Sequence, residues 1–154
     1  MNKEPPHNCE IERAVLCGIL KDGMDKRPFY DDINPDDFYS AANRRVFEAV
    51  LKLRENGIEP ERLALITELK KAAKLDEAGG EEYVRSLYDF LPGSANGQFY
   101  TNVMLDHSDR RSLLRVAGET AAGACDESKE LRGIVDNALR SLNTIKQRVT
   151  AVNG

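Results

Sequence analysis

Six apolar residues near the end of the chain recur at alternating intervals of four and three positions. They are Leu131, Val135, Ala138, Leu142, Ile145 and Val149. This spacing is that of the a and d positions of a coiled coil, which form one stripe along a helix and pack against another helix. The pattern therefore predicts a long helix whose stripe needs a partner along most of its length.

A second series with similar spacing precedes the first. Its members are Val103, His107, Arg110, Leu114, Ala117, Ala121 and Ala124. The polar residues 125–128 separate the two series, so a short connection joins two helices whose stripes face each other. We predict an antiparallel helical hairpin over residues 98–150, with residues 151–154 beginning a linker or tail. Two helices alone bury too little apolar surface to be stable, so the hairpin also needs the rest of the chain, a second copy or a partner.

The residues before the hairpin have a different composition, because all Phe and Tyr residues lie between Phe29 and Tyr100. Large side chains fill a three-dimensional core, whereas two paired helices bury only a narrow seam. An expected N-cap at Asn8 and an expected helix end at Gly23 mark the first of several short helices. No segment alternates apolar and polar residues as a strand does. The predicted fold class is all-α, with a globular multi-helix lobe over residues 1–97 followed by the hairpin.

The charge balance does not favour a protein that grips phosphate backbones. The chain has 22 Lys and Arg against 26 Asp and Glu, and its net charge is −4. Such proteins draw most of their affinity from clustered Lys and Arg, so we expect little direct binding of nucleic acid. The longest apolar run, residues 14–20, is too short to span a membrane, and no signal-peptide segment follows the N-terminus. We expect a cytoplasmic protein without membrane contact.

Motifs that carry catalytic chemistry are absent from the sequence. Neither GxxxxGK[ST] nor a GxGxxG pattern after a strand occurs, and no pair of His or Cys residues has the spacing of a structural zinc site. Acidic pairs at 31–32, 36–37 and 81–82 lie at expected helix starts, where carboxylates stabilise the helix dipole. We therefore expect no catalytic residue, no cofactor and no metal site.

The residues expected to bind a second copy or a partner lie on the two stripes of the hairpin. They are Arg110, Arg111, Leu114, Ala117, Ala121, Leu131, Val135, Ala138, Leu142 and Ile145. Small residues between 117 and 124 would let another helix approach closely. Arg110 falls on the stripe itself, where a charge is costly unless it is paired, so we expect it to face the edge of the lobe or a partner's carboxylate.

Six motifs, in the same order along the chain, resemble those of the N-terminal part of DnaB-type replicative DNA helicases. They are PHNCEIERAVL at 6–16, NPDDFY at 34–39, RRVFEAV at 44–50, GGEEY at 79–83, PGSANGQFY at 92–100 and RRSL at 110–113. The chain departs from the family pattern at Cys9, where Leu is usual, at Cys17, where Gly is common, and at Asn43, where His is usual. Residues 60–62 (PER) also replace the usual PVD after the turn at Gly57.

The resemblance implies a helical lobe plus a hairpin, with the ATPase in a separate domain. It also implies that hairpins pair between subunits to build the collar of a ring hexamer, a trimer of dimers, and that DnaG-type primase docks on this collar. The chain is then expected to be a scaffold in DNA replication and not an enzyme by itself.

Two other interpretations remain open from the sequence. A stand-alone relative of the helicase N-terminal domain, for example from a phage, could regulate or inhibit a host helicase or primase. A helical nucleic-acid-binding domain could use Arg110, Arg111 and Arg115, although residues 98–154 hold only eight Lys and Arg against seven Asp and Glu.

Overall fold

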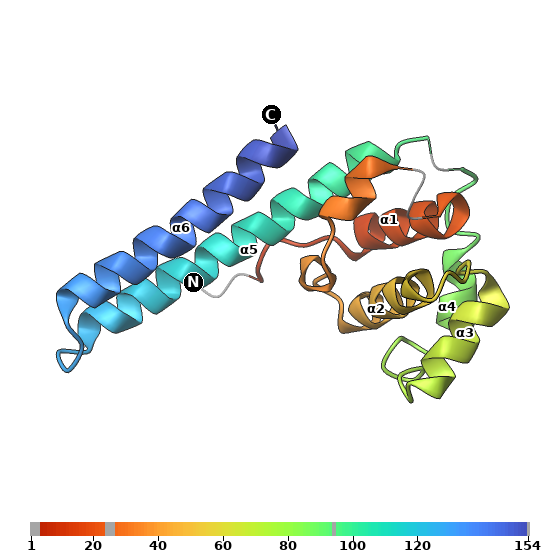
Figure 1. The fold of residues 1–154 in the computed structure, drawn as a ribbon, viewed down its shortest axis with the longest axis horizontal. Helices are drawn as coiled ribbons and strands as arrows, with labels where there is room; N and C mark the ends of the chain where they lie inside the picture. Colours follow the sequence, from red (N-terminus) through yellow and green to blue (C-terminus); the bar gives the residue numbers. More distant parts are fainter. Residues whose placement is uncertain (1–3, 24–26, 94, 154) are drawn as a thin grey trace. The chain divides into compact units, whose positions relative to one another are not determined.

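A computed structural model of the chain describes residues 4–23, 27–93 and 95–153. These residues form six α-helices and two short 3-10 helices, and they contain no strand. In chain order the elements are α1 (Cys9–Asp22), η2 (Pro28–Asp32), η3 (Pro35–Asp37), α2 (Ala41–Glu55), α3 (Arg62–Lys71), α4 (Glu81–Leu87), α5 (Gly97–Cys125) and α6 (Leu131–Asn153). The predicted all-α fold is confirmed (Figure 1). Among the described helices none is long and apolar enough to cross a membrane.

Helix α1 begins and ends where the sequence predicts. Asn8 Oδ1 accepts hydrogen bonds from the backbone N–H groups of Glu10 (3.0 Å) and Ile11 (3.1 Å), which have no partner inside the helix. At the other end Gly23 has φ +83°, a left-handed conformation that glycine adopts without strain, and its N–H donates to Ile19 O at 2.7 Å.

A compact lobe extends from His7 to Leu105. Within it α2 contacts α1, α3 and η3, and α4 contacts both α1 and α3. The largest fully buried side chains include those of Tyr30, Phe38 and Phe47. Aromatic side chains therefore do fill the centre of the lobe.

A buried carboxylate connects α1 to the start of α2. Glu12 is only 2% exposed, and its two oxygens accept hydrogen bonds from Tyr39 N (2.7 Å), Ser40 N (3.2 Å) and Asn43 Nδ2 (3.0 Å). Asn43 Oδ1 in turn accepts a hydrogen bond from the hydroxyl of Tyr83 in α4. The departure from the family pattern at Asn43 therefore lies in a polar network that joins three helices.

Of the described residues, the second compact unit combines residues 4–6 with residues 106–153. The predicted boundary lay at residue 97, eight residues earlier than the division at Leu105. The difference arises because Thr101, Met104 and Leu105 are buried and belong to the lobe. Helix α5 runs without interruption through this division, and α6 continues to Asn153, through most of the segment predicted as a linker or tail.

Candidate interaction surface on the helical hairpin

Helix α6 lies beside the later part of α5 and runs in the opposite direction, as expected for an antiparallel hairpin (Figure 1). Residues 126–130 connect the two helices. Asp126 holds this connection in shape, because its Oδ1 accepts hydrogen bonds from the backbone N (3.0 Å) and Oγ (2.6 Å) of Ser128. These two hydrogen bonds favour the carboxylate form and lower the pKa of Asp126.

Two contacts define the register of the hairpin. Near the connection, a Cβ atom at Gly123 would lie 3.4 Å from Cγ2 of Ile134, so glycine lets the two helices approach closely there. Near the other end, Arg148 Nε lies 3.4 Å from Asp109 Oδ1, and both side chains are mostly buried. Between these two contacts, moving one residue forward along α5 corresponds to moving one residue back along α6.

The half-buried residues of α6 form the stripe that faces α5. They are Ile134, Ala138, Ser141, Ile145 and Arg148. On α5 the residues that face α6 include Val116, Thr120 and Gly123. The stripe keeps a spacing of four and three but contains small and polar residues.

The prediction that these two stripes face each other inside the hairpin is therefore wrong. On α6 only Ala138 and Ile145 of the predicted series lie in the contact, whereas the four others are exposed. The exposed fractions are 71% for Leu131, 47% for Val135, 41% for Leu142 and 38% for Val149. The close approach at Gly123 places Ile134 in the contact, and the neighbouring Leu131 and Val135 then turn outward.

The predicted series on α5 is displaced in the same way. Leu114, Ala117, Ala121 and Ala124 are exposed rather than packed against α6. Arg110 is also exposed, and its Nε pairs with Asp106 Oδ2 at 2.7 Å, so no buried charge has to be balanced.

The outward-facing apolar residues of both helices share one side of the hairpin. Each residue of an α-helix is turned about 100° from the one before it. In each helix, the residue directly after a contact residue points to one side of the contact. Because the two helices run in opposite directions, this is the same side of the hairpin for both helices. We call this side the hairpin face. Its apolar residues are Leu113, Leu114, Ala117, Ala121 and Ala124 of α5 and Leu131, Val135, Leu139, Leu142 and Val149 of α6.

The hairpin face carries most of the residues that the sequence marked for partner binding. Of the two arginines, Arg110 lies among the apolar residues, whereas Arg111 Nη1 donates to Pro6 O at 2.8 Å. Contiguous exposed apolar surface of this kind usually marks an interaction site, since a soluble domain gains nothing from exposing it. Sequence reasoning omitted Leu113 and Leu139, which the spacing of four and three passes over.

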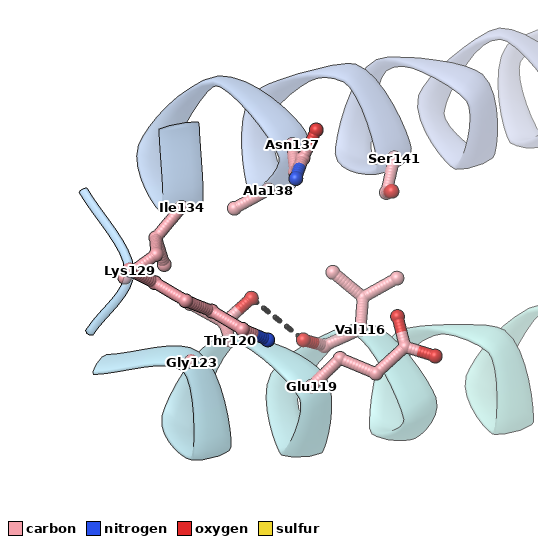
Figure 2. Close-up of a pocket in the computed structure, with 9 residues that line it drawn as sticks. All are labelled: Val116, Glu119, Thr120, Gly123, Lys129, Ile134, Asn137, Ala138 and Ser141. Carbon is pink, nitrogen blue, oxygen red and sulfur yellow. Dashed lines mark hydrogen bonds between the residues drawn. The ribbon is translucent and has the colours of Figure 1, made fainter. Parts of the chain in front are cut away.

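A cavity of about 300 Å³ separates α5 from α6 near the connection (Figure 2). Its walls combine apolar and polar side chains. They are Val116, Glu119, Thr120, Gly123, Lys129, Ile134, Asn137, Ala138 and Ser141. The hydroxyl of Thr120 is already used, since it donates to Val116 O at 2.7 Å (Figure 2). The described residues also include no group of three or more His, Cys, Asp or Glu that could hold a metal ion.

Comparison with known families decides the affiliation of the chain. The family described as "DnaB-like helicase N terminal domain" matches residues 4–106. The chain belongs to this family. The match covers the whole lobe and ends where the second compact unit begins.

Relatives among well-characterised proteins extend the DnaB match into the hairpin. The chain is 38% identical over 140 residues to the replicative DNA helicase DnaB of Treponema pallidum, an alignment that covers 91% of this chain. It is 33% identical over 145 residues to the DnaB helicase of Geobacillus stearothermophilus, which covers 94% of this chain. In both cases the chain spans 32% of the relative's own length, so it corresponds to about a third of those helicases.

Solved structures show the same DnaB N-terminal fold. The N-terminal domain of DnaB helicase from Mycobacterium tuberculosis has a TM-score of 0.81 at 24% identity, and the match covers 92% of this chain and 99% of that one. A DnaB-like replicative helicase, solved in a study of its interactions with primase, has a TM-score of 0.72 at 17% identity. That match covers 90% of this chain and 31% of the helicase chain.

Proposed function

We propose that this chain is the collar domain of a replicative DNA helicase and that it joins helicase subunits in pairs through the hairpin face. Membership of the DnaB N-terminal family supports the general role. The exposed apolar residues of the hairpin face support the pairing, and this is the observation on which the proposal depends.

The chemistry of the hairpin face suits a second copy of the same chain. The hairpin face has large side chains on α6 and small ones on α5. The large side chains of one copy can therefore pack against the small ones of a second copy. A twofold pair uses the same patch on both partners, which needs this kind of self-complementary surface. Burying a leucine such as Leu131 contributes roughly 1.5–3 kcal/mol, so a few such residues per subunit stabilise a pair.

In the proposed ring, three such pairs form a collar beside the ATPase domains, and primase docks on that collar. The structural likeness to a helicase that was studied with primase supports primase as the partner. Arg110, Leu114, Ala117, Ala121, Leu131, Val135 and Leu142 are the proposed pairing residues. Ala138 and Ile145 support them from inside the hairpin, because they pack toward α5.

Direct binding of nucleic acid is not the proposed role. Arg110 and Arg115 are paired with acids one turn away on α5, Asp106 and Glu119, and Arg111 is bound to a backbone oxygen. Each guanidinium would have to leave its acceptor to reach a phosphate.

A retention experiment with two partners tests the collar role. The chain is immobilised and offered the primase and the full-length replicative helicase of the organism from which it comes. We expect primase to be retained and the helicase to form mixed assemblies with the chain. Retention of neither protein, by a chain that is folded by circular dichroism, would contradict the proposal.

A further inference from the structure

Helix α6 packs loosely on α5. Within residues 131–151, for which burial is described, no side chain of α6 is buried, and those that face α5 are half-buried. The cavity of about 300 Å³ lies between the two helices, and the polar Asn137 and Ser141 are among the residues that α6 contributes to it (Figure 2). Packed protein interiors leave few voids larger than a water molecule. The observed contact therefore leaves room for larger side chains between the helices.

Larger side chains lie on α6 itself, a small rotation away. We call the residues of α6 that face α5 the inner stripe, and the larger apolar residues beside them the outer stripe. The inner stripe is Ile134, Ala138, Ser141, Ile145 and Arg148, and the outer stripe is Leu131, Val135, Ala138, Leu142, Ile145 and Val149. At about 100° per residue, the centres of the two stripes are about 60° apart around the helix. The stripes share two residues, so a rotation by this angle exchanges one for the other without sliding α6 along α5.

The rotation improves the apolar packing at the cavity. It turns Asn137 away from α5 and brings Val135 and Leu142 toward the side of α5 that carries Val116 and Gly123. Burial of apolar side chains lowers the free energy of the chain roughly in proportion to the area removed from water. The hydrophobic effect therefore favours the rotated position.

Helix α5 can stay in place during this rotation. Its first turns are fixed, because Thr101, Met104 and Leu105 are buried in the lobe. Helix α6 begins after the connection at residues 126–130, which is exposed throughout. Rotation of α6 about its own axis therefore displaces no buried side chain among its described residues, and it meets the same side of α5 in both positions.

An ion pair opposes the rotation. Arg148 Nε lies 3.4 Å from Asp109 Oδ1, and the exposed fractions of the two side chains are 28% and 13%. Arg148 is at the edge of the inner stripe farthest from the outer stripe, so the rotation carries its guanidinium away from Asp109. A mostly buried carboxylate that loses its cation is costly. The ion pair therefore favours the observed position.

We propose that α6 has two packing positions on α5 and that its rotation between them controls whether the hairpin face is available. In the observed position the outer stripe faces outward and can pair. In the rotated position α5 covers Leu131, Val135 and Leu142, so the hairpin face loses most of its large side chains. The effect on pairing rests on the proposed function, whereas the rotation itself is a property of the single chain.

Two pairs of introduced cysteines distinguish the two positions in the 154-residue chain, with Cys9 and Cys125 replaced by Ser. Val116→Cys with Ser141→Cys joins residues that line one cavity in the observed position. Val116→Cys with Leu142→Cys joins residues that face each other after rotation. A disulfide needs Cβ atoms about 4 Å apart, so each bond reports one position. At low protein concentration in oxidised glutathione we expect both to form within the chain, the 116–142 bond about tenfold more slowly. Absence of the 116–142 bond would overturn the proposal.

Loss of the ion pair is expected to favour the rotated position. Arg148→Met keeps the length of the side chain but not its charge, so we expect the 116–142 disulfide to form about tenfold faster relative to the 116–141 disulfide. Arg140→Met is the matched control, because Arg140 is exposed and donates to Asn137 Oδ1 on its own helix at 3.1 Å. Equal rates in the two variants would refute the claim that the ion pair holds α6 in the observed position.

The same disulfides show whether rotation controls pairing. Light scattering compares the oxidised and reduced forms of each cysteine pair, so the reduced form controls for the substitutions themselves. We expect the oxidised 116–142 form to be monomeric at micromolar concentration and the other three forms to pair. Dimers of the oxidised 116–142 form would contradict control by rotation. A wild-type chain that does not pair contradicts the proposed function, whereas the oxidation rates still decide whether α6 rotates.

Discussion

At the scale of single residues, Glu12 links α1 to the start of α2. Its carboxylate is buried, yet it accepts three hydrogen bonds from the beginning of α2 and so replaces the water that those donors lose. The arrangement also places a negative charge at the N-terminus of α2, where the helix dipole favours it. Glu12 of α1 therefore supports the start of α2 together with the N-cap Ser40, whose Oγ accepts a hydrogen bond from Asn43 N.

Replacement of Glu12 by Ala is expected to destabilise the lobe by about 3 kcal/mol, since it leaves two backbone N–H groups and an amide without their acceptor. Urea denaturation followed by circular dichroism measures this loss. Glu10→Ala is the matched control, because Glu10 is in the same turn of α1 but exposed, and we expect it to cost less than about 0.5 kcal/mol. Equal losses in the two variants would show that Glu12 does not hold α2.

Two tyrosines, the buried Tyr30 and the half-buried Tyr83, predict how stability changes at alkaline pH. Burial raises the pKa of Tyr30 and of Tyr83 to about 12. An unfolded chain releases these protons near pH 10 and the folded chain only near pH 12. Stability is therefore complete below pH 10 and falls as pH rises from 10 to 12. Urea midpoints measured at pH 9, 10 and 11 test this, and replacement of Tyr83 by Phe is expected to reduce the dependence on pH.

At the scale of the elements, local signals could be predicted and long-range contacts could not. The cap at Asn8 and the end at Gly23 depend on a few neighbouring residues, so the sequence was sufficient for them. The buried Glu12 was missed, because its partners are about 30 positions away along the chain. The prediction placed the contact between α5 and α6 on the wrong residues, because a pattern of regularly spaced apolar residues gives most weight to large side chains. In the structure, Ile134 of α6 packs close to Gly123 of α5, and apolar spacing alone does not indicate this contact.

Glycines of α5 allow a test of the hairpin contact. Gly118 has no atom within 4 Å of an added Cβ, so Gly118→Ala is expected to stabilise the chain by about 1 kcal/mol through helix propensity alone. Gly123→Leu is expected to destabilise it by about 1–3 kcal/mol, because the larger side chain meets Ile134 and forces the helices apart. Thermal unfolding measures both effects. A stabilising effect of Gly123→Leu would show that α6 does not pack at Gly123.

At the scale of the whole molecule, the exposed apolar side chains are distributed unevenly. Five of them lie on α6 alone, whereas α3 exposes only Leu63. Side chains that the folded chain leaves on its surface in this way are available to a partner. The functional role proposed above depends on that surface.

The charge of the whole chain predicts weak interaction with DNA. The chain has a net charge of −4, and the arginines of α5 are already engaged with neighbouring acceptors. We expect single-stranded DNA to bind poorly, with an affinity that depends only slightly on salt. A titration at several salt concentrations measures the slope. A steep slope, which reports several phosphate contacts, would favour a direct role in DNA binding instead.

Light scattering of a matched pair of variants tests the hairpin face most directly. Leu131 and Leu63 are similarly exposed, at 71% and 65%, and each lies in the first turn of a helix, where an introduced Asp is well tolerated. We expect the wild-type chain and Leu63→Asp to form dimers at micromolar concentration and Leu131→Asp to be monomeric with unchanged helix content. A wild-type monomer at high concentration, or dimers that persist in Leu131→Asp and also in Leu142→Asp, would contradict pairing through the hairpin face.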